Sequence, residues 1–251
     1  EIAPHQALIC TGIGCASKLP PYATVNGPHT LHGRPGPVAT GARLANHGSA
    51  NELHILTVHG DGDGYGMGLG HFAHVARRNV GIVDVLQNNR IYGLTRGQYS
   101  PTSDRGMRTP TSPEGALDGP VPPLALAITM GATFVARGYP GQLPHLVSIL
   151  GQALQHRGYA LIDVLQPCVT FNRASAYDFY NARIYKLEEA GHDVTDRTAA
   201  WERAQEWGDR IPIGIFYRTE DMPAYEEQLA PMGASAPLTA TEIAALRREA
   251  M

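Results

Sequence analysis

The chain has 251 residues, 43% of them hydrophobic, and a formal net charge of −3 at pH 7. This length and apolar content suit one α/β domain with an extension and can fill a sizeable core. The small negative charge argues against nucleic-acid binding, and no apolar run approaches the ~20 residues that cross a membrane. We also expect no signal peptide at the start of the sequence. Three cysteines are too few for a disulfide scaffold, so we predict a reducing, cytoplasmic location.

Strand-like and helix-like segments alternate along the first two thirds of the sequence. Apolar, β-branched runs predict buried strands at 7–13, 53–59, 80–86, 133–137 and 160–165. Segments typical of helices occur at 36–46, 71–76, 124–130 and 143–156. This alternation predicts an α/β fold, a doubly wound, mostly parallel sheet with helices on both faces.

Two further segments depart from this pattern. Residues 99–123 are dense in Pro, Ser, Thr and Gly, and a structureless loop of this length is usually functional, often a lid. Residues 171–251 are more polar, with helical patches predicted at 182–190, 197–207 and 239–249. We therefore expect an α/β domain over 1–168 and an extension over 169–251 that packs on the core or on a partner subunit.

Polar residues follow two neighbouring predicted strands of the sheet. Gly60-Asp61-Gly62-Asp63 comes after one strand, and Asn88-Asn89 comes after the next. Ligands of parallel α/β sheets bind at such strand ends. The Asp61 carboxylate, the Asn89 amide oxygen and a free backbone carbonyl could converge on one Mg²⁺ ion, whose remaining ligands would be diphosphate oxygens. The pattern predicts a metal–diphosphate clamp.

Other phosphate-binding motifs do not match. The glycines between 60 and 70 all fall on even positions, which excludes G-x-G-x-x-G within the run. The chain's only lysines, Lys18 and Lys186, do not form the G-K-[ST] of a P-loop. Two plainer interpretations stay open: a glycine-rich turn that lets strand and helix pack closely, and Asp61 as a turn former.

Further motifs make a family recognisable. They are Gly12-Ile13-Gly14-Cys15-Ala16-Ser17-Lys18, the stretches 27–34 and 37–41, Ile91-Tyr92-Gly93-Leu94-Thr95-Arg96-Gly97-Gln98, Ser100-Pro101-Thr102-Ser103, and Pro167-Cys168-Val169-Thr170-Phe171-Asn172. In this order they resemble the β subunit of 2-oxoacid:ferredoxin oxidoreductases, most closely the 2-oxoglutarate branch. The resemblance also takes in 196–200 and 211–218, and it implies a sheet of the thiamine-diphosphate-binding type.

The resemblance implies an activity and its partners. The reaction would be the reversible oxidative decarboxylation of 2-oxoglutarate with coenzyme A to succinyl-CoA and CO₂, with electrons passed to ferredoxin. An α subunit would complete a heterodimer or a dimer of heterodimers. Three alternatives remain: pyruvate or broad 2-oxoacid specificity, a non-redox thiamine-dependent decarboxylase or synthase, and a catalytically inactive regulatory subunit.

The resemblance also assigns cofactor residues. Mg²⁺ would be held by Asp61, Asn89 and the carbonyl of Ile91. Thiamine diphosphate would be contacted by Ile13, Gly14, Cys15, Ala16, His32, Gly60, Asp61, Gly62, Asp63, Asn89, Gly93, Leu94 and Thr95. Asp63 has an alternative role, capping the N-terminus of the following helix.

Cys15 and Cys168 match two of the four thiolates that hold a [4Fe–4S] cluster in this family. The other two belong to an upstream C-P-x-C-G segment that this sequence does not contain, and two thiolates alone cannot hold the cube. A cluster would therefore require such a segment in the intact protein. We interpret Cys10, on a predicted strand, as a core thiol, with a ligand role as the alternative.

Lys18 and Arg96 are the candidates for recognising the substrate's distal carboxylate, because each lies a few residues beyond a cofactor-binding turn. The alternative for Arg96 is an ordinary surface arginine. No Glu between residues 2 and 51 suits the buried site beside the aminopyrimidine ring. The resemblance places that catalytic Glu on the partner subunit, so the chain alone should be inactive.

Overall fold

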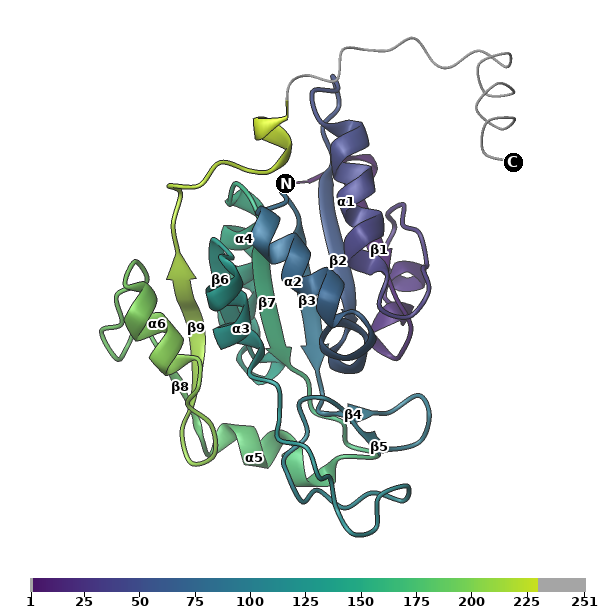
Figure 1. The fold of residues 1–251 in the computed structure, drawn as a ribbon, viewed down its shortest axis with the longest axis vertical. Coiled ribbons are helices and arrows are strands. Elements are labelled where there is room, and N and C mark those ends of the chain that lie inside the picture. Colours follow the sequence, from purple (N-terminus) through teal and green to yellow (C-terminus); the bar gives the residue numbers. More distant parts are fainter. Residues whose placement is uncertain (1, 230–251) are drawn as a thin grey trace.

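The computed structural model describes residues 2–229, and within them the main sheet has seven strands (Figure 1). In sheet order these are β1 (Ala7–Thr11), β2 (His54–Gly60), β3 (Val83–Asn88), β7 (Ala160–Leu165), β6 (Phe134–Gly138), β9 (Ile211–Arg218) and β8 (Ile184–Lys186). The first five run parallel, whereas β9 pairs antiparallel with β6 and β8 runs parallel to β9. A separate antiparallel ribbon joins β4 (Ile91–Tyr92) to β5 (Gln98–Tyr99).

Helices cover both faces of this sheet (Figure 1). One face carries α1 (Pro35–Asn46), α2 (Leu69–Arg78), α3 (Pro123–Met130) and α6 (Arg197–Arg203), and the other carries α4 (Leu143–Gln155). The short helix α5 (Tyr177–Asn181) follows β7. Short helical turns occur at η1 (Pro4–Gln6), η2 (Ala16–Lys18), η3 (Pro20–Tyr22), η4 (Gly62–Met67, a π-helical turn), η5 (Pro140–Gln142), η6 (Arg173–Ser175) and η7 (Glu226–Gln228).

Apolar cores lie on the two faces of the sheet. Phe72 and Leu124 pack on the face that includes Leu161, while Ile149 packs on the face that includes Ile162. Every residue of β7 is buried, as expected for a central strand covered on both sides. The prediction of a doubly wound, mostly parallel α/β fold is confirmed.

The crossover from β2 to β3 positions the predicted clamp. Helix α2 buries Phe72, Val75 and Ala76, and the residue that follows its last turn, Asn79, adopts a left-handed conformation with φ 54°. The Asn79 side chain accepts hydrogen bonds from Thr133 Oγ1 at 2.6 Å and from the backbone N–H that immediately precedes β7. This connection brings the C-terminal ends of β2 and β3 side by side.

The C-terminal segment differs in part from the sequence expectation. The predicted helix at 182–190 is wrong, because Ile184–Lys186 forms β8 beside β9. Its Ile-Tyr pair favours a strand once an edge of the sheet is available for pairing. Helix α6 begins as predicted, where the Asp196 carboxylate accepts hydrogen bonds from two backbone N–H groups, but it ends at Arg203. The predicted helix at 239–249 lies outside the described residues.

The long predicted loop is present between β5 and α3. An isolated bridge joins Thr109 to Ser112, and side chains near the start of the loop reach back to the ends of β2 and β3. In the part of the chain that the structure describes, no helix has both the length and the apolar character needed to cross a membrane.

Candidate active site

An open cavity of about 440 Å³ lies where β2, β3 and β7 end. Every residue assigned above to the cofactor, the magnesium ion or the iron–sulfur cluster lines it: Ile13, Gly14, Cys15, Ala16, His32, Gly60, Asp61, Gly62, Asp63, Asn89, Ile91, Gly93, Leu94, Thr95 and Cys168. The sequence analysis gave no role to the other lining residues, which are Gln87, Tyr92, Gln166, Pro167, Val169 and Thr170. Several of these follow β7, so the rule that strand ends bind ligands could have identified them.

Asp61 is a buried carboxylate directly after β2, with 2% of its surface exposed. Its Oδ2 accepts hydrogen bonds from Ser100 Oγ at 2.5 Å and from Thr102 Oγ1 at 2.7 Å. Burial raises the pKa of Asp61, and the two hydroxyl groups oppose that rise. Within residues 2–229 Asp61 forms no ion pair, in contrast to the other buried aspartates, which face His59 (Asp63 and Asp84) or Arg137 (Asp163). A carboxylate buried without a cation is costly, so this position favours a bound metal ion.

Asn89 and Ile91 flank a tight turn after β3. The Ile91 N–H donates to Asn89 Oδ1 at 3.1 Å, and Asn172 Nδ2 donates to the Asn89 carbonyl at 3.0 Å. Arg90, between them, has φ 60°, a strained conformation for a residue with a long side chain. Its guanidinium is buried and donates to the long loop, which holds the turn in place. The turn directs Asn89 and Ile91 to the same cavity as the buried carboxylate.

Asp63 joins three segments around the cavity. Its Oδ1 accepts hydrogen bonds from Ile13 N at 3.1 Å and Gly33 N at 2.9 Å and lies 2.5 Å from His32 Nδ1, while its Oδ2 lies 2.9 Å from His59 Nδ1. Burial raises the pKa of Asp63, but His59 and the backbone N–H groups outweigh it and the pKa is lowered. The alternative that Asp63 caps the following helix is wrong, because no side chain caps η4 or α2.

His59 lies between two carboxylates beneath the cavity. Its Nδ1 faces Asp63, and its Nε2 lies 2.7 Å from Asp84 Oδ1. Asp84 also accepts hydrogen bonds from Thr57 Oγ1 at 2.6 Å and Tyr159 Oη at 2.7 Å. Burial lowers the pKa of His59, yet Asp84 and Asp63 overcome this and raise it to about 9. The sequence analysis assigned no role to His59. A histidine and an aspartate inside two predicted buried strands nevertheless indicate an internal charge pair, because buried polar groups need polar partners.

The glycine turn is shaped by an aromatic ring. Tyr92 Oη donates to the Gly62 carbonyl at 3.1 Å, and a Cβ atom at Gly62 would lie 2.1 Å from the Tyr92 ring. Any side chain at Gly62 would therefore displace that ring. The glycine therefore lets the Tyr92 ring pack directly against the backbone of this turn.

The two candidate cluster cysteines lie at the same end of the cavity. A Cβ atom at Gly93 would be 3.7 Å from Cys15 Sγ and 3.9 Å from Cys168 Sγ. Within residues 2–229, no group of three or more His, Cys, Asp or Glu side chains is arranged to hold a metal ion. The two thiols therefore do not complete a four-iron site by themselves. Cys10 is fully buried, and burial raises its pKa to about 11, in agreement with its prediction as a core thiol.

Lys18 and Arg96 do not line the cavity. Both are exposed, Lys18 at the end of η2 and Arg96 in a left-handed turn with φ 78°. Each is nevertheless within two residues of a lining residue, Ala16 or Thr95. Their role in substrate recognition stays a prediction.

The fold belongs to the class of thiamine-diphosphate-binding enzymes. Residues 12–164 match the protein-family model described as "Thiamine pyrophosphate enzyme, C-terminal TPP binding domain". Residues 168–233 match the model that describes the C-terminal part of the pyruvate ferredoxin oxidoreductase β subunit.

Relatives place the chain within this class. The 2-oxoacid:ferredoxin oxidoreductase 1, subunit beta, of Aeropyrum pernix is 44% identical over 240 residues, which cover 92% of this chain and 74% of the relative. The 2-oxoglutarate oxidoreductase subunit KorB of Mycobacterium tuberculosis is 46% identical over 171 residues, or 68% of this chain and 45% of the relative. A structure of 2-oxoglutarate:ferredoxin oxidoreductase from Magnetococcus marinus, with 2-oxoglutarate, coenzyme A and succinyl-CoA bound, matches with a TM-score of 0.87 and 37% identity, covering 98% of this chain and 84% of the other.

The chain belongs to the family of 2-oxoacid:ferredoxin oxidoreductase β subunits, and the family prediction made from the sequence is confirmed. Membership of a β-subunit family implies that the chain has an α subunit as its partner.

Proposed function

We propose that this β subunit binds thiamine diphosphate through a magnesium ion held by Asp61, Asn89 and the Ile91 carbonyl. The observation that carries the proposal is the Asp61 carboxylate, which is buried and unpaired by any cation in the described chain. Mg²⁺ prefers oxygen ligands of these kinds and would balance the charge. The backbone around Gly62 and Gly93 would then line the diphosphate.

The chain's own residues would position the cofactor. Thiamine diphosphate, when bound, supplies the carbanion that attacks a 2-oxo acid and accommodates the electrons left after decarboxylation. Asp63 fixes His32 at the cavity wall, where the imidazole can contact the cofactor or carry a proton. No glutamate of the described chain lines the cavity. We therefore assign the glutamate beside the aminopyrimidine to the α subunit and expect the β subunit alone to be inactive.

For the substrate we propose 2-oxoglutarate, converted with coenzyme A to succinyl-CoA and CO₂. The names of the M. tuberculosis relative and of the M. marinus structure support this choice over pyruvate or a broad range of 2-oxo acids. Arg96, or Lys18, would pair with the distal carboxylate from the rim of the cavity. A guanidinium binds a carboxylate bidentately, so Arg96 is the first candidate.

Ferredoxin is the proposed electron acceptor, reached through a [4Fe–4S] cluster in the cytoplasmic enzyme. Cys15 and Cys168 would supply two of its four thiolates, since both sulfur atoms face the space beside Gly93. A non-redox thiamine enzyme would have no use for this pair of thiols. Iron analysis of the assembled enzyme separates the two functions.

The clamp is tested by the Asp61→Ala variant in the assembled enzyme. Loss of a primary ligand of a hard cation should cost several kcal/mol and abolish Mg²⁺-dependent binding of thiamine diphosphate. Binding is measured by calorimetry with and without Mg²⁺. Asp209→Ala, at an exposed aspartate, is the control and should bind as the wild type does. Undiminished affinity in Asp61→Ala would remove the clamp.

A further inference from the structure

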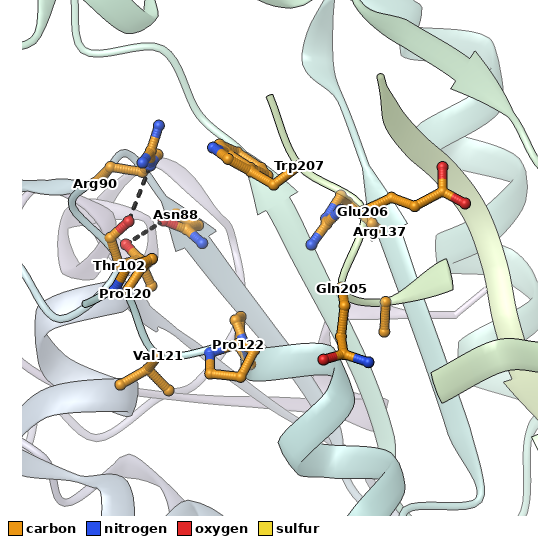
Figure 2. A pocket seen from close by; sticks show the side chains of 12 residues that line it. Asn88, Arg90, Thr102, Pro120, Val121, Pro122, Arg137, Gln205, Glu206 and Trp207 are labelled. Atoms are coloured by element: carbon orange, nitrogen blue, oxygen red, sulfur yellow. Dashed lines mark hydrogen bonds between the residues drawn. The ribbon is translucent and has the colours of Figure 1, made fainter. Parts of the chain in front are cut away.

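A second cavity of about 210 Å³ is lined by Asn88, at the end of β3, and by Arg137 of β6 (Figure 2). The end of the long loop forms one wall through Val121 and Pro122, and the segment after α6 forms another through Gln205 and Trp207. This cavity shares no lining residue with the active-site cavity. It has no role in the function proposed above.

A buried arginine faces this second cavity. Arg137 is 3% exposed; its Nε pairs with Asp163 Oδ2 at 3.3 Å, and its Nη1 donates to the Pro212 carbonyl at 3.4 Å. Its Nη2 has no hydrogen-bond acceptor among the described residues, although the side chain lines the cavity. This nitrogen is not sealed off in the core but opens to the cavity, where it can donate to an anionic oxygen of a ligand.

The other cationic and acidic groups of this cavity are already engaged. Arg90 donates through Nε to the Thr102 carbonyl at 3.0 Å, and its other nitrogens face Ser175 and Asp104. The carboxylate of Glu206 is bonded to Arg203 and to Tyr185 Oη. Arg137 is therefore the group in this cavity that can bind an added anion.

The rest of the lining suits a flat, apolar body. Val121, Pro122 and the ring of Trp207 surround the space in front of Arg137 (Figure 2). Trp207 lies against both guanidinium groups, 4.5 Å from Arg90 Cζ and 5.6 Å from Arg137 Cζ, which holds the ring in place. A protein cavity of ~150 Å³ holds one benzene molecule, so this space accommodates a single ring with a carboxylate and is too small for a nucleotide.

We infer that this cavity binds a small monocarboxylate with a planar apolar body, whose carboxylate accepts a hydrogen bond from Arg137. Its wall touches the clamp: Thr102 Oγ1 donates to Asp61 Oδ2 at 2.7 Å and contacts Asn88 Oδ1 at 2.9 Å. Thr102 therefore belongs both to the wall of this cavity and to the support of Asp61. Binding is therefore coupled to the thiamine diphosphate site, a part of the inference that rests on the proposed clamp.

The site is tested with 4-fluorobenzoate as the probe, observed by ¹⁹F NMR on the assembled enzyme without thiamine diphosphate. We expect saturable line broadening, and at least tenfold weaker binding of the neutral 4-fluorobenzamide. Val121→Phe fills the cavity and should abolish binding. Val147→Phe, the same change at an exposed position of α4, should leave it intact.

Several results would overturn the site. They are broadening that does not saturate, unchanged binding in Val121→Phe, and equal binding of the amide and the acid. If Val121→Phe fails to assemble, Gln205→Trp blocks the exposed rim of the same cavity and gives the same test.

The coupling is tested by measuring thiamine diphosphate affinity with and without saturating 4-fluorobenzoate. We expect affinity to rise at least about 5-fold, with the reciprocal effect on the probe. An unchanged affinity would overturn the coupling. If instead Mg²⁺-dependent thiamine diphosphate binding is absent altogether, the proposed clamp fails, while probe binding still reports on the carboxylate site.

Discussion

The buried charge chain around His59 makes stability depend on pH. Burial disfavours the imidazolium, but Asp84 and Asp63 stabilise it and raise the pKa of His59 from 6.5 to about 9. Because the folded protein holds this proton more tightly than the unfolded chain, the stabilisation is complete below pH 6.5 and is lost as pH rises to about 9. The difference between the two pKa values corresponds to about 3 kcal/mol at 298 K. His59 should therefore account for a loss of about that size between pH 6.5 and 9.

The assay is urea unfolding of the full-length β subunit at pH 6.5, 7.5 and 9, followed by circular dichroism. His59→Gln removes the titrating group and should remove this loss, although the variant is less stable at every pH because two buried carboxylates lose their cation. His54→Gln makes the same change at an exposed position of the same strand, and it should retain the wild-type pH dependence.

An equal loss of stability in the wild type and in His59→Gln would show that another group binds the proton. If His59→Gln does not fold, Asp84→Asn removes one of the two carboxylates that hold the imidazolium. That variant should lower the pKa of His59 and reduce the pH dependence. Direct titration of the His59 ring by NMR then gives the same answer.

Three further outcomes test the site. Gly62→Ala should displace the Tyr92 ring, which should destabilise the fold by about 1–3 kcal/mol and weaken thiamine diphosphate binding. Thermal unfolding and calorimetry measure the two effects. An unperturbed variant would show that the turn has room for a side chain. Cys15→Ser or Cys168→Ser, in the intact heteromer, should bleach the ~400 nm absorbance of the iron–sulfur cluster while thiamine diphosphate stays bound. A full iron content in both variants would show that the two cysteines are structural. Arg96→Ala should lower kcat/KM for 2-oxoglutarate by ~10²-fold, about 2.7 kcal/mol, with far less effect on kcat/KM for pyruvate. Equal losses on both substrates would show that Arg96 orients the 2-oxoacid end that the two substrates share.

The parallel core was predictable because its strands are apolar on both faces. A continuous run such as 160–165 has few alternatives to a buried central strand. At the edge of the sheet, local sequence is less decisive. Ile184–Lys186 became a strand because Ile211–Arg218 offers it a partner, and that pairing joins residues far apart in the chain. A short stretch of sequence, considered by itself, contains no information about such a partner strand.

The cavity was predictable because strand ends locate ligands in parallel sheets. The residues that follow β2 and β3 were visible as polar breaks in apolar runs, and they do line one space. The contacts that support these residues could not be predicted from the sequence. Ser100 and Thr102 reach Asp61 from 39 and 41 positions away, out of a loop with no periodicity. Such contacts depend on how the loop folds back, which propensity does not determine.

Asp61 and Asp63 illustrate how neighbouring carboxylates acquire different roles. They stand two positions apart in one glycine-rich turn, and both are buried. Asp63 has its charge balanced by His59 and its oxygens occupied by several donors, so its pKa is lowered and it serves as an internal link between loops. Asp61 accepts hydrogen bonds from two hydroxyl groups but faces no cation of the described chain, so burial raises its pKa. A divalent ion would relieve that cost at Asp61 and would gain little at Asp63, and this difference supports Asp61, over Asp63, as the proposed metal ligand.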